Sequence, residues 1–193
     1  MAHRCRDERP GYHHVVARGN NKQPIFRTDD DRRRFLSILD RVAKKHRWEV
    51  LAYCLMRNHY HLVVRIDDSG LARGMCELNG SYALTFNETY GRINHLFGRR
   101  YWSEHLAHEG RLLNAIRYVV ENPRRAGFDG PLEEHGWTSY RATIGLALAF
   151  ARFARDEVLG LFGADPARAV ARFVEFCAPR HDVPASHAQR QPP

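Results

Sequence analysis

Two apolar runs separated by only two residues constrain the fold of this chain more than any other feature. The first run covers residues 48–56 and the second begins at His59, so Arg57-Asn58 leaves room only for a tight hairpin between antiparallel strands. Side chains alternate between the two faces along a strand. His59 and His61 are therefore expected on one side of the sheet, and Tyr60 on the other, where it can enter a core.

The other periodic segments place this hairpin in a larger pattern. Strands are expected over 12–18 and 99–107, and helices over 28–45 and 71–86. The order is then strand, helix, strand, strand, helix, strand, which is the ferredoxin-like βαββαβ arrangement of the α+β class. Two helices should cover one face of the antiparallel sheet and leave the other face free to carry a site.

Helix signals extend the prediction toward the C-terminus. Thr28 is a good N-cap for the first helix, and Asp165 followed by Pro166 marks the start of a last one. A third helix should run from about Glu109 to Asn122 and stop before Pro123. We expect α-helix over 137–153 as well, within added C-terminal helices. The predicted divisions are a flexible leader (1–10), a catalytic domain that includes the third helix (11–143), a helical extension (144–177) and a disordered tail (178–193).

Composition restricts the class of protein. The 193 residues carry 30 Lys and Arg against 22 acids, a formal charge of +8, which favours a polyanionic partner such as nucleic acid. A generic basic protein would share this charge. The four cysteines lack C-x-x-C spacing, which argues against a zinc ribbon and a disulfide scaffold, and Cys54 and Cys76 should be buried thiols. No apolar run is long enough for a membrane span, so we expect a cytoplasmic protein.

A second stretch gives the histidine pair a chemical meaning. Tyr118 and Asn122 lie four residues apart on the third helix, hence on one face. If this helix meets the free sheet face, His59, His61 and Asn122 could hold one divalent ion, Mg²⁺ or Mn²⁺, with open positions for a phosphate oxygen. The Tyr118 phenol could then attack phosphorus and form a covalent phosphotyrosine. A surface His-Tyr-His without a ligand and a core tyrosine are the alternatives.

These residues lie within stretches that resemble a known family, the REP-associated tyrosine transposases, relatives of the single-tyrosine HUH transposases of small insertion sequences. The similar stretches keep their order and spacing over roughly residues 10–177. They are Tyr-His-His-Val at 12–15, Arg-Gly-Asn-Asn at 18–21, Ala-Tyr-Cys-Leu-Met-Arg-Asn-His-Tyr-His-Leu at 52–62, Gly-Arg-Arg-Tyr-Trp-Ser at 98–103, Arg-Tyr-Val-Val-Glu-Asn-Pro-Arg-Arg-Ala-Gly at 117–127 and Trp-Thr-Ser-Tyr at 137–140.

The resemblance implies the HUH transposase fold, a Mg²⁺ or Mn²⁺ site and single-stranded DNA with palindromic hairpins as substrate. It also implies cleavage to a 5′-phosphotyrosine. By matched position, His59 and His61 are the metal-binding histidines, Tyr118 is the nucleophile and Asn122 is the third ligand. The chain departs from the family in two places. Arg57 stands where a proline is expected, and Asn-His-Leu at 94–96 stands where Gly-His-Leu is usual.

Further residues are candidates for contact with DNA or with the phenol. The DNA candidates are basic, amide or aromatic side chains, which can bind phosphates, base edges or unpaired bases: Arg18, Asn20, Asn21, Arg99, Arg100, Tyr101, Trp102, Arg124 and Arg125. Besides the metal, Arg117 is a candidate for helping the phenol of Tyr118 to react. The helical extension could cover the surface that insertion-sequence relatives use to dimerise, which favours a monomer and leaves a dimer open. A regulator that binds hairpin DNA or RNA without cutting it, and a metal phosphohydrolase that uses water, are the rival functions.

Overall fold

Four strands form one antiparallel sheet at the centre of the molecule. The computed structural model describes residues 9–67 and 70–179, so most of the predicted leader and tail lies outside the described residues. The strands are β1 (Gly11–Arg18), β2 (Glu49–Met56), β3 (His59–Ile66) and β4 (Trp102–His105). Their order is β2-β3-β1-β4, with every neighbouring pair antiparallel. This is the ferredoxin-like order, and the predicted fold class is confirmed.

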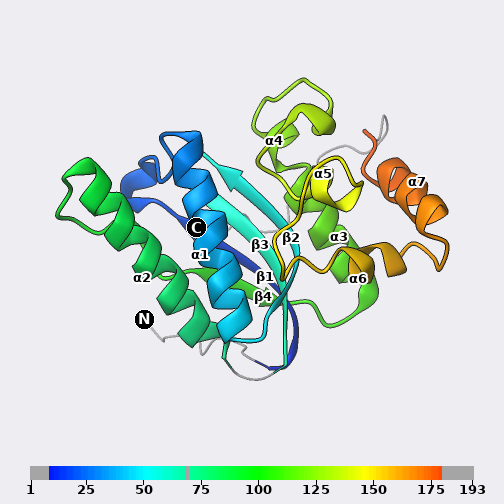
Figure 1. The fold of residues 1–193 in the computed structure, drawn as a ribbon, viewed down its shortest axis with the longest axis horizontal. Helices are drawn as coiled ribbons and strands as arrows, with labels where there is room; N and C mark the ends of the chain where they lie inside the picture. Colours follow the sequence, from blue (N-terminus) through cyan, green and yellow to red (C-terminus); the bar gives the residue numbers. More distant parts are fainter. Residues whose placement is uncertain (1–8, 68–69, 180–193) are drawn as a thin grey trace.

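Helices α1 (Asp29–Lys45) and α2 (Leu71–Tyr90) lie side by side over one face of the sheet (Figure 1). Their apolar stripes and the inward residues of the strands form the first core. Its largest fully buried members include Phe26, Phe35, Trp48, Tyr60, Tyr82 and Phe86. Gly74 of α2 faces Trp48 so closely that a Cβ at this position would lie 2.1 Å from the indole. Any side chain there would overpack the core.

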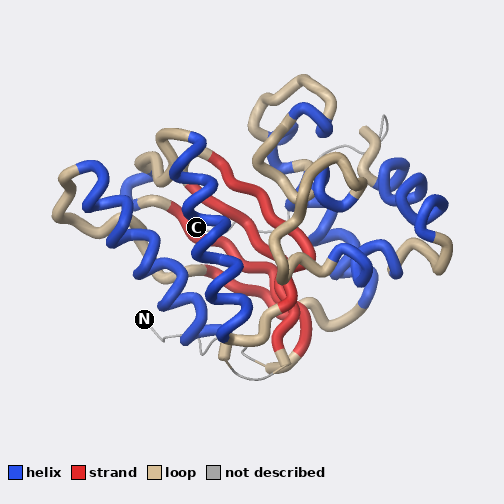
Figure 2. Tube along the Cα trace, viewed as in Figure 1, coloured by secondary structure: helices blue, strands red, loops and turns tan. Residues whose placement is uncertain are grey.

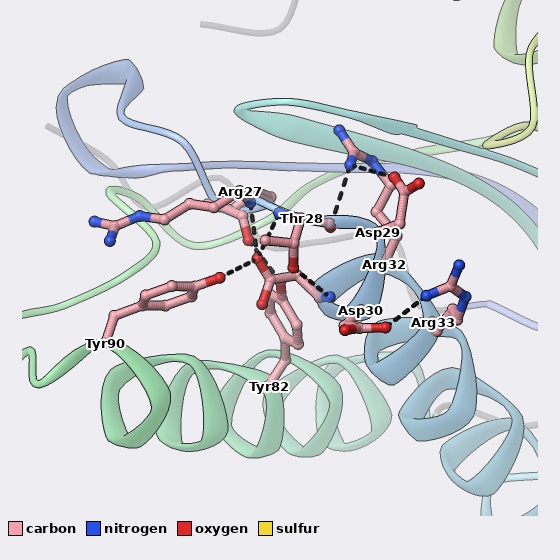
Figure 3. A network of polar contacts seen from close by, with 10 residues as sticks. Arg27, Thr28, Asp29, Asp30, Arg32, Arg33, Tyr82 and Tyr90 are labelled. Carbon is pink, nitrogen blue, oxygen red and sulfur yellow. Dashed lines mark hydrogen bonds and ion pairs between the residues drawn. The ribbon is translucent and has the colours of Figure 1, made fainter.

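The start of α1 is fixed by a network of polar contacts between α1 and α2 (Figure 3). The hydroxyl of Thr28 accepts from the backbone of Asp31, whose carboxylate accepts from the Thr28 backbone in return, so a capping box supports the predicted N-cap. The same carboxylate accepts from the Tyr90 hydroxyl of α2 at 2.8 Å. The cap therefore also holds α1 and α2 together on the face of the sheet that they cover.

The second face of the sheet, expected to be free, is largely covered. It is packed by α3 (Glu109–Val120) and by shorter helices that follow it, namely α4 (Asn122–Arg125), α5 (Tyr140–Thr143), α6 (Arg155–Gly160) and α7 (Pro166–Phe176) (Figure 2). A second core forms there from Leu51, Cys54 and Val63 of the strands, Ile116 and Val119 of α3, and Leu159 and Phe173 of the extension. Strands β2 and β3 are thus buried on both faces, which explains their nearly continuous apolar sequence.

Several sequence-based boundaries were wrong. The fourth strand covers only Trp102–His105, and within 137–153 only Tyr140–Thr143 is α-helical. The third helix ends at Val120, and Pro123 then lies in the first turn of α4, where a missing backbone N–H costs nothing. Cys76, expected to be buried, is exposed on α2. The Asp165 N-cap with Pro166 in the first turn of α7 is confirmed.

Candidate active site

The imidazole pair lies on the face of β3 that α3 covers. His59 and His61 have ring centroids 5.1 Å apart, as the alternation of side chains along a strand predicts. His61 is only 2% exposed, and His59 is half-buried where β3 begins. Arg18, the last residue of β1, pairs with His59 across the two strands. The strand ends therefore bring a guanidinium to the rim of the histidine pair.

Burial keeps both imidazoles neutral. It lowers the pKa of His59 to about 4, an effect to which the charge of Arg18 adds and which the side chain of Asn122 opposes. Burial also lowers the pKa of His61 well below its ordinary value, and the neighbouring His14, His59 and Arg18 lower it further. A neutral imidazole has a lone pair to offer to a metal ion, so the site holds its histidines in the form that binds divalent ions.

Helix α3 brings the second half of the predicted constellation to the same place. The ring of Tyr118 lies 5.5 Å from that of His61, centroid to centroid, and is half-buried. Asn122, at the start of α4, is 6% exposed, and its side chain lies close enough to His59 to oppose the lowering of the His59 pKa. The structure thus brings together the four residues His59, His61, Tyr118 and Asn122, which are distant in the sequence.

A third histidine, which was not among the predicted site residues, belongs to this cluster. His14 of β1 is 6% exposed, and its Nε2 lies 3.1 Å from Nδ1 of His61. Its ring is nearly parallel to that of His61, at 21° with centroids 5.3 Å apart, so the two rings meet edge to edge through these nitrogens, and it meets the ring of Tyr118 edge-on at 5.8 Å. The signal was present in the sequence, because His14 and Arg18 are four residues apart on one strand and so share a face.

The sequence suggested Arg117 as the arginine that helps the phenol. In the structure the arginine beside the phenol is Arg125. The Arg117 guanidinium binds Glu121 at 2.8 Å and donates to the carbonyl of Ala178. It therefore faces the C-terminal extension. The guanidinium carbon of Arg125 lies 5.0 Å from the ring centroid of Tyr118, and Arg125 is exposed. Arg125 of α4 follows Tyr118 by seven residues, about two helical turns, and so lies over the ring.

Most of the predicted DNA-binding residues gather at the strand end beside His59. The loop after α2 is joined to the end of β1, since Gly98 donates to the Arg18 carbonyl and Asn20 donates to that of Leu96. This contact places two pairs of side chains, Asn20-Asn21 and Arg99-Arg100, on one edge of the molecule. Arg99 and Arg100 are exposed there. We refer to Arg18, Asn20, Asn21, Arg99 and Arg100 as the basic edge.

The DNA candidates still to be described are Trp102, Tyr101 and Arg124. Trp102 is half-buried, and its ring meets that of His14 edge-on at 5.4 Å, so it borders the cluster. Tyr101 is 6% exposed within the first core, and a ring in that position is not available to stack on a base. The guanidinium of Arg124 donates to the Cys177 carbonyl at the end of α7 and leaves only part of the side chain exposed.

The donor set matches a divalent ion only if an amide takes part. In the described part of the chain, no three His, Cys, Asp or Glu side chains are grouped as a metal site. His59 and His61 supply two neutral nitrogens, and the buried amide of Asn122 is a further donor beside His59. Two imidazoles and an amide oxygen fit Mn²⁺ or Mg²⁺ with positions left for water and phosphate oxygens. Over residues 9–67 and 70–179, no helix has both the length and the apolar character to cross a bilayer.

Comparisons with known proteins bear on the fold and on the family of this chain. A structure described as a REP-associated tyrosine transposase bound to a REP hairpin aligns with a TM-score of 0.63 at 14% identity, covering 80% of this chain and 96% of that one. A candidate transposase from Deinococcus radiodurans R1 aligns at 16% identity over 63% of this chain and 97% of its own, with a TM-score of 0.45, too low to bear on the fold. No curated protein matches the sequence. The family described as IS200-like transposases matches residues 10–122, more than half of the chain, and the protein therefore belongs to that family.

Proposed function

We propose that this protein cuts and rejoins single-stranded DNA next to a hairpin through a covalent 5′-phosphotyrosine at Tyr118. The observation that carries the proposal is the meeting of α3 with β3, where the phenol ring lies 5.5 Å from the ring of His61 and the side chain of Asn122 acts on the pKa of His59. Membership of a transposase family supports a reaction on DNA. A protein that only grips DNA has no use for a half-buried phenol beside two neutral imidazoles.

The chain's own residues account for the transfer. The phenol oxygen of Tyr118 forms a bond to phosphorus as the bond from phosphorus to the 3′ oxygen breaks, which leaves a 3′ hydroxyl and a 5′-phosphotyrosine. The phenol gives up one proton and the leaving oxygen takes one. A second strand's 3′ hydroxyl reverses these steps and regenerates the phenol, so joining needs no ATP. Arg125, over the ring, is placed to bind the phosphate as it reaches the phenol oxygen.

The metal requirement is part of the proposal. His59, His61 and Asn122 would hold Mg²⁺ or Mn²⁺, because all three are available as neutral donors on one face of the sheet. When bound, the ion would supply Lewis-acid polarisation of the scissile phosphate and stabilise the charge that develops on its oxygens. The protein's contribution is to keep the imidazoles unprotonated and to shield them from solvent.

The basic edge gives the strand a path to the site. Exposed guanidinium groups at Arg99 and Arg100 can follow a DNA backbone, and Trp102 borders the cluster where a base could stack. The solved relative was bound to a hairpin, and we propose the same class of substrate here. We also propose a monomer, since α6 and α7 of the same chain cover much of the face that carries α3.

The test is trapping of the covalent adduct. A labelled oligonucleotide with a hairpin and single-stranded flank is incubated with the protein and Mn²⁺, and products are resolved under denaturing conditions. We expect a protein-linked label that Tyr118→Phe abolishes while DNA binding persists. Binding without any adduct would favour a non-cleaving regulator. Cleavage that survives Tyr118→Phe and fails with His59→Ala would instead show that water is the nucleophile.

A further inference from the structure

One buried imidazole of the cluster has no part in the proposed reaction. His14 lies on β1, on the same face as His61, and is 6% exposed. Its closest polar contact in the cluster is the 3.1 Å approach of its Nε2 to Nδ1 of His61. Ring contacts with His61, Tyr118 and Trp102 enclose the rest of the side chain. Such packing holds both imidazoles in one orientation.

A hydrogen bond between two neutral imidazoles has only two forms, and the difference between them matters. If His14 donates from Nε2, then Nδ1 of His61 accepts, and the only proton of the His61 ring is on Nε2. If His61 donates from Nδ1, then His14 accepts and Nε2 of His61 keeps its lone pair. Because Nδ1 of His61 is engaged by His14, Nε2 is the nitrogen left for an ion. Only the second form is compatible with metal binding at Nε2.

The neighbouring ligand has the same arrangement with a different partner. Nδ1 of His59 lies 2.7 Å from Oδ1 of Asn58. The amide nitrogen of Asn58 donates to the carbonyl of Lys22, which fixes the orientation of the amide, so Oδ1 must accept from His59. His59 therefore carries its proton on Nδ1 and presents Nε2 unprotonated. Each ligand has a partner at Nδ1, and His14 is that partner for His61.

We propose that His14 is a positioning residue for metal binding: it accepts a hydrogen bond from Nδ1 of His61 and so fixes the tautomer and ring orientation in which Nε2 of His61 can bind the ion. This role rests on the proposed function of the site. It differs from the usual carboxylate partner of a metal-binding histidine, because a neutral imidazole adds no charge to the buried site.

Three substitutions separate this role from packing. In glutamine the amide oxygen lies as many bonds from Cα as Nε2 of histidine does, so His14→Gln keeps an acceptor in place. In asparagine the amide corresponds to Nδ1, so His14→Asn is polar but too short, and His14→Leu fills space without an acceptor. His13→Gln, on the neighbouring histidine of the opposite face, is the matched control.

The measurement is Mn²⁺ affinity without DNA, from the free-ion signal in electron paramagnetic resonance, with thermal unfolding in chelator to verify folding. We expect His14→Leu and His14→Asn to weaken binding by about 10- to 100-fold. His14→Gln and the control should stay close to the unsubstituted protein.

Equal affinity for all variants would refute the role of His14 and leave the proposed function intact. Equal losses for His14→Gln and His14→Leu would show that only the shape of the imidazole matters, which also overturns the proposal. If the unsubstituted protein binds no Mn²⁺, or if His59→Ala leaves its binding unchanged, the metal site of the proposed function fails and the role of His14 fails with it.

Discussion

The two faces of β3 are made by alternate residues of one strand, yet one face is part of an apolar core and the other carries a polar cluster. Tyr60, Leu62 and Val64 are fully buried against α1 and α2, and their side chains form part of the first core. His59 and His61 face α3 and bring polar atoms into a buried setting. Burial lowers the free energy of the folded state on the first face, whereas on the second it lowers the pKa of imidazoles. The same physical effect gives stability on one face and reactivity on the other.

Replacing one residue on each face should give the largest difference between the two faces. His61→Ala should reduce Mn²⁺-dependent cleavage on the order of a thousandfold, or about 4 kcal/mol of transition-state stabilisation. Leu62→Ala should lower the free energy of unfolding by about 2–5 kcal/mol and leave cleavage per folded molecule largely unchanged. Adduct formation and urea unfolding of both variants are the measurements. Near-normal cleavage by His61→Ala would show that this face is not the active one.

The pH dependence of stability should sharpen the comparison, because the site face carries three imidazoles on β1 and β3, His14, His59 and His61, whose pKa values burial lowers. An imidazole in the unfolded chain has a pKa of about 6.5, whereas burial lowers the pKa of His14 and of His59 to about 4. Between these values the unfolded chain binds more protons, so stability falls as the pH is lowered.

The expected loss at about pH 5, relative to neutral pH, is about 2 kcal/mol for each of these two histidines. Urea unfolding in chelator at both pH values measures it. Replacing His14 and His59 with glutamine should flatten the dependence, since neither side chain then titrates. A free energy of unfolding that is the same at both pH values would mean that the imidazoles are not buried as described.

The smallest expected effect concerns Arg125 at the rim of the site. Arg125→Ala should slow adduct formation about tenfold, because a charge-assisted contact with the phosphate is lost. Arg125→Lys should fall in between, since it keeps the charge without the planar fork. Arg33→Ala, on an exposed position of α1 over the other face, removes only a surface ion pair with Asp30 and serves as the control. Equal rates for the alanine variants in single-turnover reactions would remove Arg125 from the proposal.

Local sequence patterns correctly predicted several features of the structure. The two-residue connection, the alternation around His59 and His61 and the caps at Thr28 and Asp165 depend on neighbouring residues only, and the structure contains all of them. The same rule applied to β1 puts His14 on one face with Arg18, but only the pairing of β1 with β3 places that face at the site. The errors concern contacts between residues that are far apart in the sequence. The i,i+4 spacing of Arg117 and Glu121 already indicates their ion pair, whereas nothing near Arg117 in the sequence indicates its contact with the extension at Ala178.

The sequence by itself determined which side chains share a face of each element, since the periods of strands and helices are properties of the backbone. It therefore paired His59 with His61 and Tyr118 with Asn122. Only the tertiary structure decided that these two pairs meet, that the second face is covered rather than open, and that His14 and Arg125 complete the cluster. The physical reason is that packing between elements depends on apolar surfaces far apart in the chain, whose fit no local period encodes.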